Sequence, residues 1–311
     1  MNILFLGAGR RKSLFYRFIE AAKIEDIPLK IFAYEDSLYV PIAPLATIIY
    51  GKKWTDKDFF EHLNKIIIEN DISVIIPCMD GATVALSSIK NSLPNNCWAV
   101  VSSSECCEIF DNKLMAEKWF NKNNIKIPSH GCSSYPVIAK KIHGFGSRGQ
   151  MIFNNQESLT YWKSITDHSD YMFQSFIPGQ EYSIAAYVSR CGEVLGCVTR
   201  ARLQISSGEV LSSFTMTKVR LENECRRILS LLKFEGPITL QAIENNDDYY
   251  FLEINPRFGG GVILSIEAGA DYPRLILREA IGRQVSKVEW EPNLLMTRSL
   301  IETFHEGWKM P

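Results

Sequence analysis

Three oxygen-bearing side chains in the C-terminal part of the chain could hold a divalent cation. Glu253 and Asn255 lie two residues apart in a run, 251–255, in which apolar and polar residues alternate. In a strand this alternation places both polar side chains on one face and their apolar neighbours on the other. Gln241, on a preceding strand, could supply a third oxygen. Carboxylate and amide oxygens suit Mg²⁺, which completes its shell with water and nucleotide phosphates.

Gln241 reaches the face of Glu253 only if the hairpin between the two strands has a suitable register. An odd loop, such as residues 245–247, or a bulge in one strand would keep Gln241 on that face. An even loop without a bulge would turn it to the opposite face. Arg257 follows just after the proposed ligands, where a guanidinium could meet a transferring phosphoryl group.

A lysine followed by a glycine-rich loop could bind phosphate. Residues 136–140 predict a buried strand that ends at Lys140, and Gly144, Gly146, Ser147 and Gly149 follow it. Glycines let backbone N–H groups approach phosphate oxygens, and a lysine supplies a point charge. An ordinary flexible hairpin loop is an equally good interpretation of this segment alone. The loop is not of the Walker A type, because the lysine precedes the glycines.

A second segment could bind the base and the sugar of a nucleotide. The run 174–181, which begins with Gln174 and Ser175 and ends with Glu181, is a strand broken at Pro178-Gly179. The broken edge would leave backbone donors and acceptors for an adenine ring, with Glu181 placed for a ribose diol. Taken alone, the segment would be a Pro-Gly turn with a solvated glutamate.

Arg200 and Arg202 project from the same face of a predicted strand. Paired arginines are usually surface charge, but two guanidinium groups on one face could also clamp a phosphate or a carboxylate. Together with the Gly259–Gly261 loop, this pair is expected to face a carboxylate substrate.

Two motifs in the N-terminal part have competing interpretations. Gly7-Ala8-Gly9 ends the first predicted strand and suggests a dinucleotide-binding turn, with Glu35 or Asp36 for a ribose hydroxyl. Lys12 occupies the place of the third glycine, so we interpret the motif as a simple tight turn. Asp80 follows another strand, where it could line a pocket, and we interpret it as a helix N-cap.

The elements that must position these residues differ between two parts of the chain. Apolar runs at 3–6, 29–33, 74–76 and 98–101 are separated mostly by helical patterns. This predicts a doubly wound α/β unit with a parallel sheet. From residue 136 onward, strands joined by hairpins predict an α+β unit. The predicted strands lie at 171–176, 181–189, 194–204, 236–244 and 249–255, and the predicted helices at 105–123, 223–233 and 271–282.

These patterns predict the domain organisation. An α/β domain covers residues 1–104 and a second domain covers 105–290. Residues 291–311 form a C-terminal tail.

Composition excludes several classes of protein. The chain has 311 residues, 46% of them hydrophobic, so it can bury a full core. With 34 basic and 35 acidic side chains it has a net charge of −1, which gives no broad field for nucleic acid or an anionic membrane. Its eight cysteines show no zinc-ligand spacing. No apolar run approaches the length of a membrane span. We therefore predict a cytoplasmic protein with reduced thiols.

Taken together, the motifs resemble the ATP-grasp superfamily, and most closely the ATP-binding half of the carbamoyl phosphate synthase large chain and its short, single-unit relatives. The likeness begins at the 6–10 segment, passes through Asp111-Asn112-Lys113, and ends at the 253–257 signature and the glycines after it. It implies an α/β domain that precedes an ATP-grasp domain, in which a small lid subdomain would take about 113–175 and a core about 176–290.

The resemblance implies a role for each residue that matches a family motif. Nucleotide-binding residues would be Lys113, Lys140, Gly144, Gly146, Ser147, Gly149, Gln174, Ser175, Phe176, Ile177 and Glu181. Ligands of Mg²⁺ or Mn²⁺ would be Gln241, Glu253 and Asn255. Catalytic residues would be Arg257, Lys140 and Arg202.

Three positions depart from the family pattern. Gln174 stands where a glutamate is usual, although its amide oxygen can still accept a hydrogen bond from the amino group of adenine. Lys141 replaces a common proline, and Ala185 occupies a position that is often acidic. These departures bear on substrate identity more than on ATP binding.

The implied activity is an ATP-dependent carboxylate–amine ligase. A small carboxylate, such as an amino acid, would be activated as an acylphosphate and joined to an amine, with release of ADP and phosphate. The chain has one unit and no repeat, so we do not expect the complete carbamoyl phosphate synthase reaction. A non-catalytic ATP-binding sensor and a nicotinamide-dependent oxidoreductase are the alternatives. We expect a homodimer, because dimers are the commonest assemblies among soluble homo-oligomers.

Overall fold

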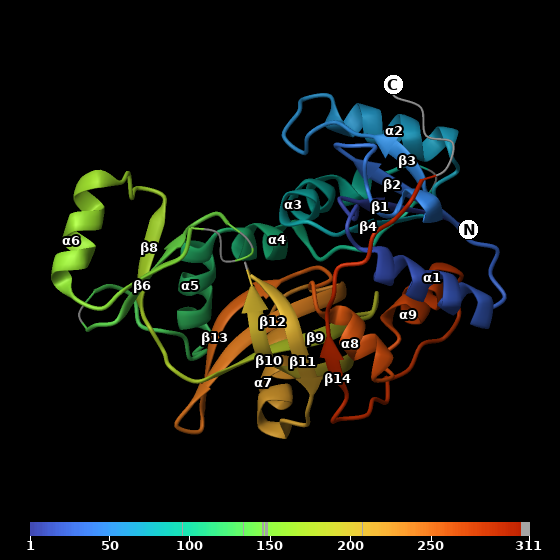
Figure 1. Cartoon of the computed structure of the whole chain (residues 1–311). Coiled ribbons are helices and arrows are strands. Elements are labelled where there is room, and N and C mark those ends of the chain that lie inside the picture. Colours follow the sequence, from blue (N-terminus) through green and yellow to red (C-terminus); the bar gives the residue numbers. More distant parts are fainter. Residues whose placement is uncertain (95, 133, 145, 147–148, 207, 306–311) are drawn as a thin grey trace.

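The computed structural model describes residues 1–305 except 95, 133, 145, 147–148 and 207, and its strands form three sheets (Figure 1). The first sheet is parallel, with the order β3-β2-β1-β4-β5. Its strands are β1 (Asn2–Leu6), β2 (Lys30–Glu35), β3 (Thr47–Tyr50), β4 (Val74–Pro77) and β5 (Trp98–Ala99). The predicted doubly wound α/β unit is therefore confirmed. The short edge strand β3 was not predicted, since its residues are half-exposed or exposed.

Helices cover both faces of the parallel sheet. Ile3 and Phe5 of β1 pack toward one face, with helix α1 (Lys12–Ile24) and helix α9 (Tyr272–Ala280). Leu4 and Leu6 pack toward the other face, with α2 (Phe59–Glu69), α3 (Asp80–Ile89) and α4 (Ser104–Asp111). Burial on both faces explains why the central strands carry continuous apolar runs.

The second sheet is antiparallel, with the order β13-β12-β9-β10-β11-β14. Its strands are β9 (Gln180–Val188), β10 (Val194–Ser206), β11 (Glu209–Thr215), β12 (Gly236–Asn245), β13 (Asp248–Asn255) and β14 (Leu295–Thr297). One face packs on α7 (Val219–Leu229) and α5 (Lys113–Lys122) through residues such as Ile184 and Leu240. The opposite face packs through Tyr187 against α9, beside α8 (Val262–Glu267) and the core of the parallel sheet. This shared core joins the two large sheets.

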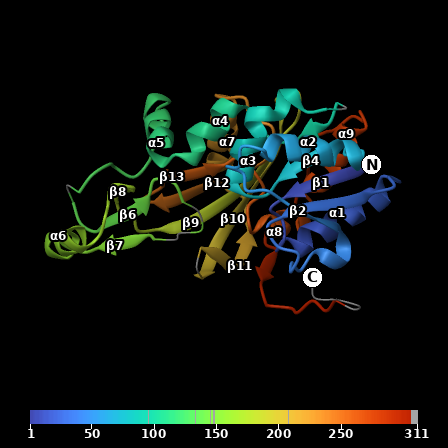
Figure 2. The ribbon, with the colours of Figure 1, turned by 90° about the horizontal axis from the view of Figure 1, so that it is seen from above.

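The third sheet is small and projects away from the parallel sheet (Figures 1 and 2). It has the order β7-β6-β8, with strands β6 (Val137–Lys141), β7 (Met151–Phe153) and β8 (Tyr171–Ser175). Helix α6 (Gln156–Ile165) covers it, with Leu159 and Trp162 packed against Ala139 and Phe153. We call this sheet the lid sheet. It lies within residues 113–175, the range predicted as a lid subdomain, whereas helix α5 of that range packs with the core of the antiparallel sheet.

The cysteines carry free thiols in the structure, as the sequence predicts. All eight cysteines are free, and most are buried. Burial raises the pKa of Cys78 to about 11 and that of Cys197 to about 12. None of the helices formed by the described residues combines the length and apolar character needed to cross a bilayer.

Candidate active site

Strand register places the predicted polar residues on one face of the antiparallel sheet. Arg200 of β10 pairs with Ser183 of β9, Ser183 pairs with Gln241 of β12, and Gln241 pairs with Glu253 of β13. Residues directly opposite one another in neighbouring strands share a face. Asn255, two residues after Glu253, faces the same way. The sheet therefore carries a polar row across four strands.

A β-bulge brings Gln241 to the face of Glu253. The loop between β12 and β13 is even, because Asn245 pairs with Asp248. Register then shifts between Gln241 and Ala242, which leaves Leu252 as the extra residue. Of the two arrangements that the sequence allowed, the structure has the bulge.

The polar row continues as a chain of hydrogen bonds. Glu253 Oε1 accepts from the side-chain amides of Gln241 (2.6 Å) and Asn255 (2.9 Å). Arg202 donates to Gln241 Oε1 (2.8 Å) and forms an ion pair with Glu181. Burial raises the pKa of Glu181, although the guanidinium of Arg202 opposes this effect. The predicted ribose ligand is thus held inside the same network as the predicted metal ligands.

Arg257 joins this network to the parallel sheet. Its Nε and one NH₂ group donate to the carboxylate of Asp80 at 2.6 and 2.9 Å. Burial lowers the pKa of Arg257, but the carboxylate of Asp80 outweighs it, so the pKa is raised. The N-cap interpretation of Asp80 was wrong. Met79 is the N-cap of α3, and the Asp80 side chain is turned to the guanidinium of Arg257.

Arginines hold the glycine loop that follows Arg257. Arg11 donates to Gly259 O (2.8 Å), Arg298 donates to Gly260 O (2.8 Å), and Arg200 donates to Gly261 O. Arg200 is fully buried, and this burial lowers its pKa to about 10. Arg200, which was expected to face a substrate, holds the glycine loop and is not among the residues that line the pocket described below.

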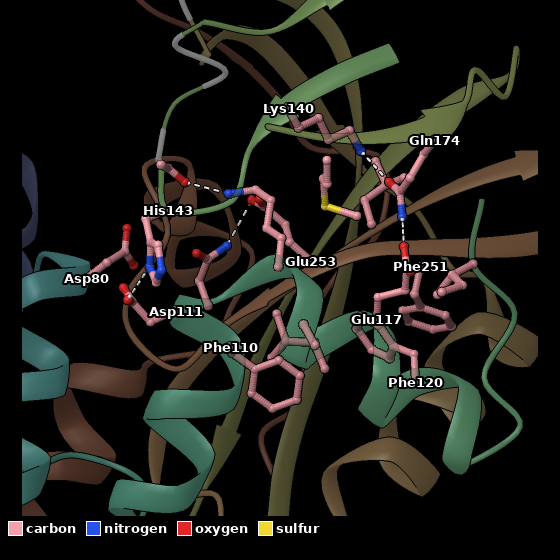
Figure 3. Close-up of a pocket in the computed structure, with 18 of the residues that line it drawn as sticks. Asp80, Phe110, Asp111, Glu117, Phe120, Lys140, His143, Gln174, Phe251 and Glu253 are labelled. Atoms are coloured by element: carbon pink, nitrogen blue, oxygen red, sulfur yellow. Dashed lines mark hydrogen bonds and ion pairs between the residues drawn. The ribbon is translucent and has the colours of Figure 1, made fainter. Parts of the chain in front are cut away.

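A pocket of about 290 Å³ lies along the free edge of β13, between the lid sheet and helices α4 and α5 (Figure 3). One end is polar and the other is mainly apolar. The polar end has Asp80, Asp111, Lys113, His143, Gly144, Glu253 and Asn255. The other end has Phe120 and Phe251, together with the polar pair Glu117 and Gln174, and the pocket lining also includes Phe110, Ile127 and Met172 (Figure 3). Lys140 lies between the two ends, where burial lowers its pKa.

The start of the glycine loop closes one side of the pocket. Lys113 Nζ donates to Gly144 O at 2.8 Å, which ties helix α5 to the loop. At the loop centre, a Cβ on Gly208 would overlap the carbonyl of Gly146, so the loop touches the β10–β11 hairpin. Gly149 lies against Lys141 and Tyr171. Ser147, which was predicted to bind the nucleotide, lies outside the described residues.

The predicted base-binding segment is only partly in the pocket. Gln174 lines it, whereas Ser175, Phe176 and Ile177 are not among its lining residues. The N–H of Ser175 donates to Ser129 O, and that of Phe176 donates to Pro136 O, both at 2.9 Å. Among the described residues, the N–H of Ile177 has no hydrogen-bond partner, so it is available to a ligand.

Glu35, one of the two acids proposed for a ribose, is engaged by the glycine turn after β1. Glu35 is buried, and its Oε1 accepts from the N–H of Ala8 at 2.6 Å. Burial raises the pKa of Glu35 to about 7, although the N–H groups of Ala8 and Gly9 lower it. This carboxyl group stabilises the turn, which supports the interpretation of Gly7-Ala8-Gly9 as structural.

The oxygen donors fit a magnesium ion that is shared with a nucleotide. Glu253 Oε2 forms no hydrogen bond within the described residues, and it belongs to a side chain that lines the pocket. The side-chain amides of Gln241 and Asn255 donate to Glu253, and their oxygens accept from Arg202 and Arg257, so each oxygen would reach a cation only after its amide turned over. Within the described ranges no group of three or more His, Cys, Asp or Glu side chains could hold a metal. Mg²⁺ needs no such group, because it takes one or two carboxylates plus phosphate oxygens and water.

Sequence reasoning missed several pocket residues. Glu117 and Phe120 follow Lys113 at helical spacing on α5, so they share its face. That spacing was a usable signal once Lys113 had been selected. His143 gave no such signal, because its contact with Asp111 (3.1 Å) joins two different segments.

Comparisons with known proteins identify the fold. Residues 167–300 match the model of a family described as ATP-grasp in the biosynthetic pathway with Ter operon. Two curated relatives are carbamoyl phosphate synthase large chains. The one from Agathobacter rectalis is 22% identical over 180 residues, and the one from Thermoanaerobacter sp. is 22% identical over 255 residues. These alignments cover 54% and 73% of this chain but only 17% and 24% of the relatives.

Solved structures agree with these matches. N5-carboxyaminoimidazole synthetase from Staphylococcus aureus, complexed with ADP, has a TM-score of 0.77 at 16% identity, over 96% of this chain and 82% of that one. L-amino acid ligase from Bacillus licheniformis has a TM-score of 0.67 at 14% identity, over 90% and 74%. The chain therefore has the ATP-grasp fold, and its residues 167–300 match a family model of ATP-grasp proteins.

Proposed function

We propose that the chain is an ATP-dependent carboxylate–amine ligase that activates a small carboxylate as an acylphosphate and releases ADP and phosphate. The observation that carries this proposal is the division of one pocket into an apolar, aromatic end and an end rich in oxygen donors and cations. A nucleoside triphosphate has the same division between its base and its phosphates. The names of the solved neighbours, a synthetase bound to ADP and an amino acid ligase, support this class of reaction.

In this proposal Lys113 and Lys140 bind phosphate oxygens, with Gly144 over them. Glu253, Asn255 and Gln241 would hold Mg²⁺ or Mn²⁺, which would neutralise phosphate charge as the carboxylate approaches. Two unit anions about 4 Å apart repel by about 1 kcal/mol in water, and by several times more in a shielded site.

Arg257 and Arg202 act through their fixed positions. Asp80 holds the Arg257 guanidinium beside Asn255, so its charge is already oriented when a phosphoryl group is transferred. Arg202 orients Gln241 and Glu181 on the nucleotide side. No covalent intermediate with the protein is required, because the carboxylate attacks the phosphoryl group and the amine then attacks the acylphosphate. Catalysis is therefore mainly positioning and electrostatic stabilisation.

The proposal can be tested by measuring ADP release with Mg²⁺ and panels of amino acids, small carboxylates and amines. Glu253→Ala and the isosteric Glu253→Gln should each lower the rate by at least about 1000-fold, because the only carboxylate of the metal-ligand set is lost. Glu193→Ala is a matched control, since Glu193 is exposed on the β9–β10 turn. Circular dichroism and thermal unfolding check that the variants fold.

Normal turnover by folded Glu253→Gln would refute the assignment of the metal ligands. ATP binding by the wild type without ADP release on any panel would favour the non-catalytic sensor. Binding of a nicotinamide dinucleotide without Mg²⁺, and no binding of ATP, would favour the oxidoreductase.

A further inference from the structure

A chain of polar side chains begins at Lys140, between the two ends of the pocket, and runs through Gln174 to Glu117 at its apolar end (Figure 3). Lys140 Nζ donates to Gln174 Oε1 at 3.2 Å. Gln174 Nε2 donates to Glu117 Oε2 at 2.9 Å, and Glu117 Oε1 contacts His130 Nδ1 at 2.8 Å. Lys140 and Gln174 come from the lid sheet, whereas Glu117 comes from helix α5.

The chemistry of the neighbours fixes the orientation of the Gln174 amide. An ammonium group only donates hydrogen bonds, and a carboxylate only accepts them. Lys140 on one side and Glu117 on the other therefore require Oε1 to face the lysine and Nε2 to face the glutamate. A flipped amide would place its NH₂ group against the ammonium and its oxygen against the carboxylate. Such opposed groups are costly here, because Gln174 is only 6% exposed.

Glu117 also supplies a negative charge to this end of the pocket. Its side chain is 11% exposed and lies among Phe120, Ile127 and Phe251. Burial lowers the pKa of Lys140, and the carboxylates of Glu253, Glu181 and Glu117 oppose this effect. Because the apolar surroundings have a lower effective dielectric constant than water, the electrostatic interaction of the Glu117 carboxylate with its neighbours is stronger there than in water.

We propose that Glu117 is a positioning and specificity residue that makes the base end of the pocket select adenine. The inference rests on the proposed function, because it requires the base to occupy the apolar end. Glu117 holds Gln174 so that the pocket presents acceptor oxygens, Gln174 Oε1 and the carboxylate itself. A 6-amino group donates to such oxygens. The 6-oxo group of guanine or hypoxanthine would instead place an oxygen against them, and leaving acceptors unpaired in a buried site is costly.

The test compares binding of the Mg²⁺ complexes of ATP, GTP and ITP to the full chain by titration calorimetry. We expect the wild type to prefer ATP. Glu117→Gln has the same shape but no charge, and its amide can donate as well as accept. It should weaken ATP binding and reduce the preference for ATP over GTP and ITP by about tenfold. Glu105→Gln on helix α4 is the matched control, because Glu105 is exposed.

A second variant separates orientation from folding. A double variant that adds Gln174→Glu to Glu117→Gln exchanges the amide and the carboxylate between the two positions. The carboxylate at position 174 then faces Lys140, and the amide at position 117 donates to that carboxylate. This double variant should regain most of the preference for ATP. A residue that only stabilises helix α5 would change binding of all three nucleotides equally, and it would not be rescued by the exchange.

The outcomes distinguish this inference from the proposed function. If the wild type binds no nucleotide, the proposed function fails and the inference fails with it. If the wild type binds ATP but folded Glu117→Gln keeps the same preference, only the role of Glu117 is refuted. Loss of preference in Glu117→Gln, regained in the exchanged double variant, supports the inference.

Discussion

Glu25 should contribute more to stability than an ordinary surface carboxylate, and the contribution should disappear in acid. It follows α1 directly, its side chain is 3% exposed, and it forms ion pairs with three arginines at the α9 end of the chain, Arg274, Arg278 and Arg283. Glu25→Gln leaves these three cations close together without their common anion. The substitution should therefore weaken the contact between α1 and α9.

The pKa of Glu25 sets the size of the expected loss in unfolding free energy. Burial alone would raise this pKa, but the three arginines outweigh burial and lower it from 4.5 to about 2. At about 1.4 kcal/mol per pKa unit, this difference gives an upper bound of about 3.4 kcal/mol. The arginine side chains are 29 to 47% exposed, so solvent screens the pairs. We therefore expect a loss of about 2 kcal/mol. Because the folded pKa is below the unfolded one, the stabilisation is complete above pH 4.5 and is lost as the pH falls through about 2.

Urea unfolding at pH 7, 4.5 and 3 measures this contribution. The difference in unfolding free energy between the wild type and Glu25→Gln should be about 2 kcal/mol at pH 7 and clearly smaller at pH 3. Glu20→Gln is the matched control, since Glu20 forms an exposed pair with Arg17 on the same helix and should cost less than about 1 kcal/mol. Equal costs for the two variants at pH 7, or a difference that does not shrink in acid, would refute the reasoning.

Three further predictions concern the pocket and the parallel sheet. Arg202→Met should raise the KM for ATP more than about tenfold, because it leaves the half-buried Glu181 without its cation. Steady-state kinetics check this, and an unchanged KM contradicts it. Gly208→Ala should cost about 1–2 kcal/mol from its positive φ and should displace the loop at Gly146. Faster proteolysis of that loop, compared with the wild type, is the readout, and unchanged proteolysis rules the contact out. The raised pKa of Glu35, about 7, predicts stability that is highest below pH 4.5 and falls by up to about 3 kcal/mol as the pH rises through 7. Glu35→Gln should flatten this dependence in urea titrations at pH 5.5 and 8, and a variant curve as steep as that of the wild type would show that another group is responsible.

The sequence predicted the local part of the site well. Alternation alone placed Glu253 and Asn255 on one face, because the side-chain period of a strand is two. The sequence could not show whether an odd loop or a bulge brings Gln241 to this face. An extra residue at Leu252 leaves the alternation of apolar and polar residues in 251–255 unchanged. The bulge depends on how β12 and β13 pair, which is a property of the sheet.

Contacts between distant segments account for most of what was missed. Asp80 was interpreted by its local context, the start of a helix, whereas its partner Arg257 lies 177 residues away. Glu117 and Gln174 come from a helix and a strand that meet only when the lid sheet packs on α5. Short edge strands such as β3 carry little apolar signal, because one of their sides is open to solvent.

Donors and acceptors that have no partner within the protein indicate where a ligand would contact the polar row of the antiparallel sheet and Arg257 beside it. A guanidinium has five N–H donors, and Arg257 uses four of them on Asp80, Asn255 and Phe258 O. In the proposed reaction Arg257 would therefore act on a phosphoryl group mainly through its charge, with at most one direct hydrogen bond while the pair with Asp80 is intact. Glu253 Oε2, in contrast, has no partner among the described residues and belongs to a side chain that lines the pocket. This difference assigns ligand contact to the carboxylate of Glu253 and fixed electrostatic support to Arg257. Substitution of Arg257 by lysine would keep the charge but lose the bidentate pair with Asp80, so the arginine is required by the parallel sheet as much as by the pocket.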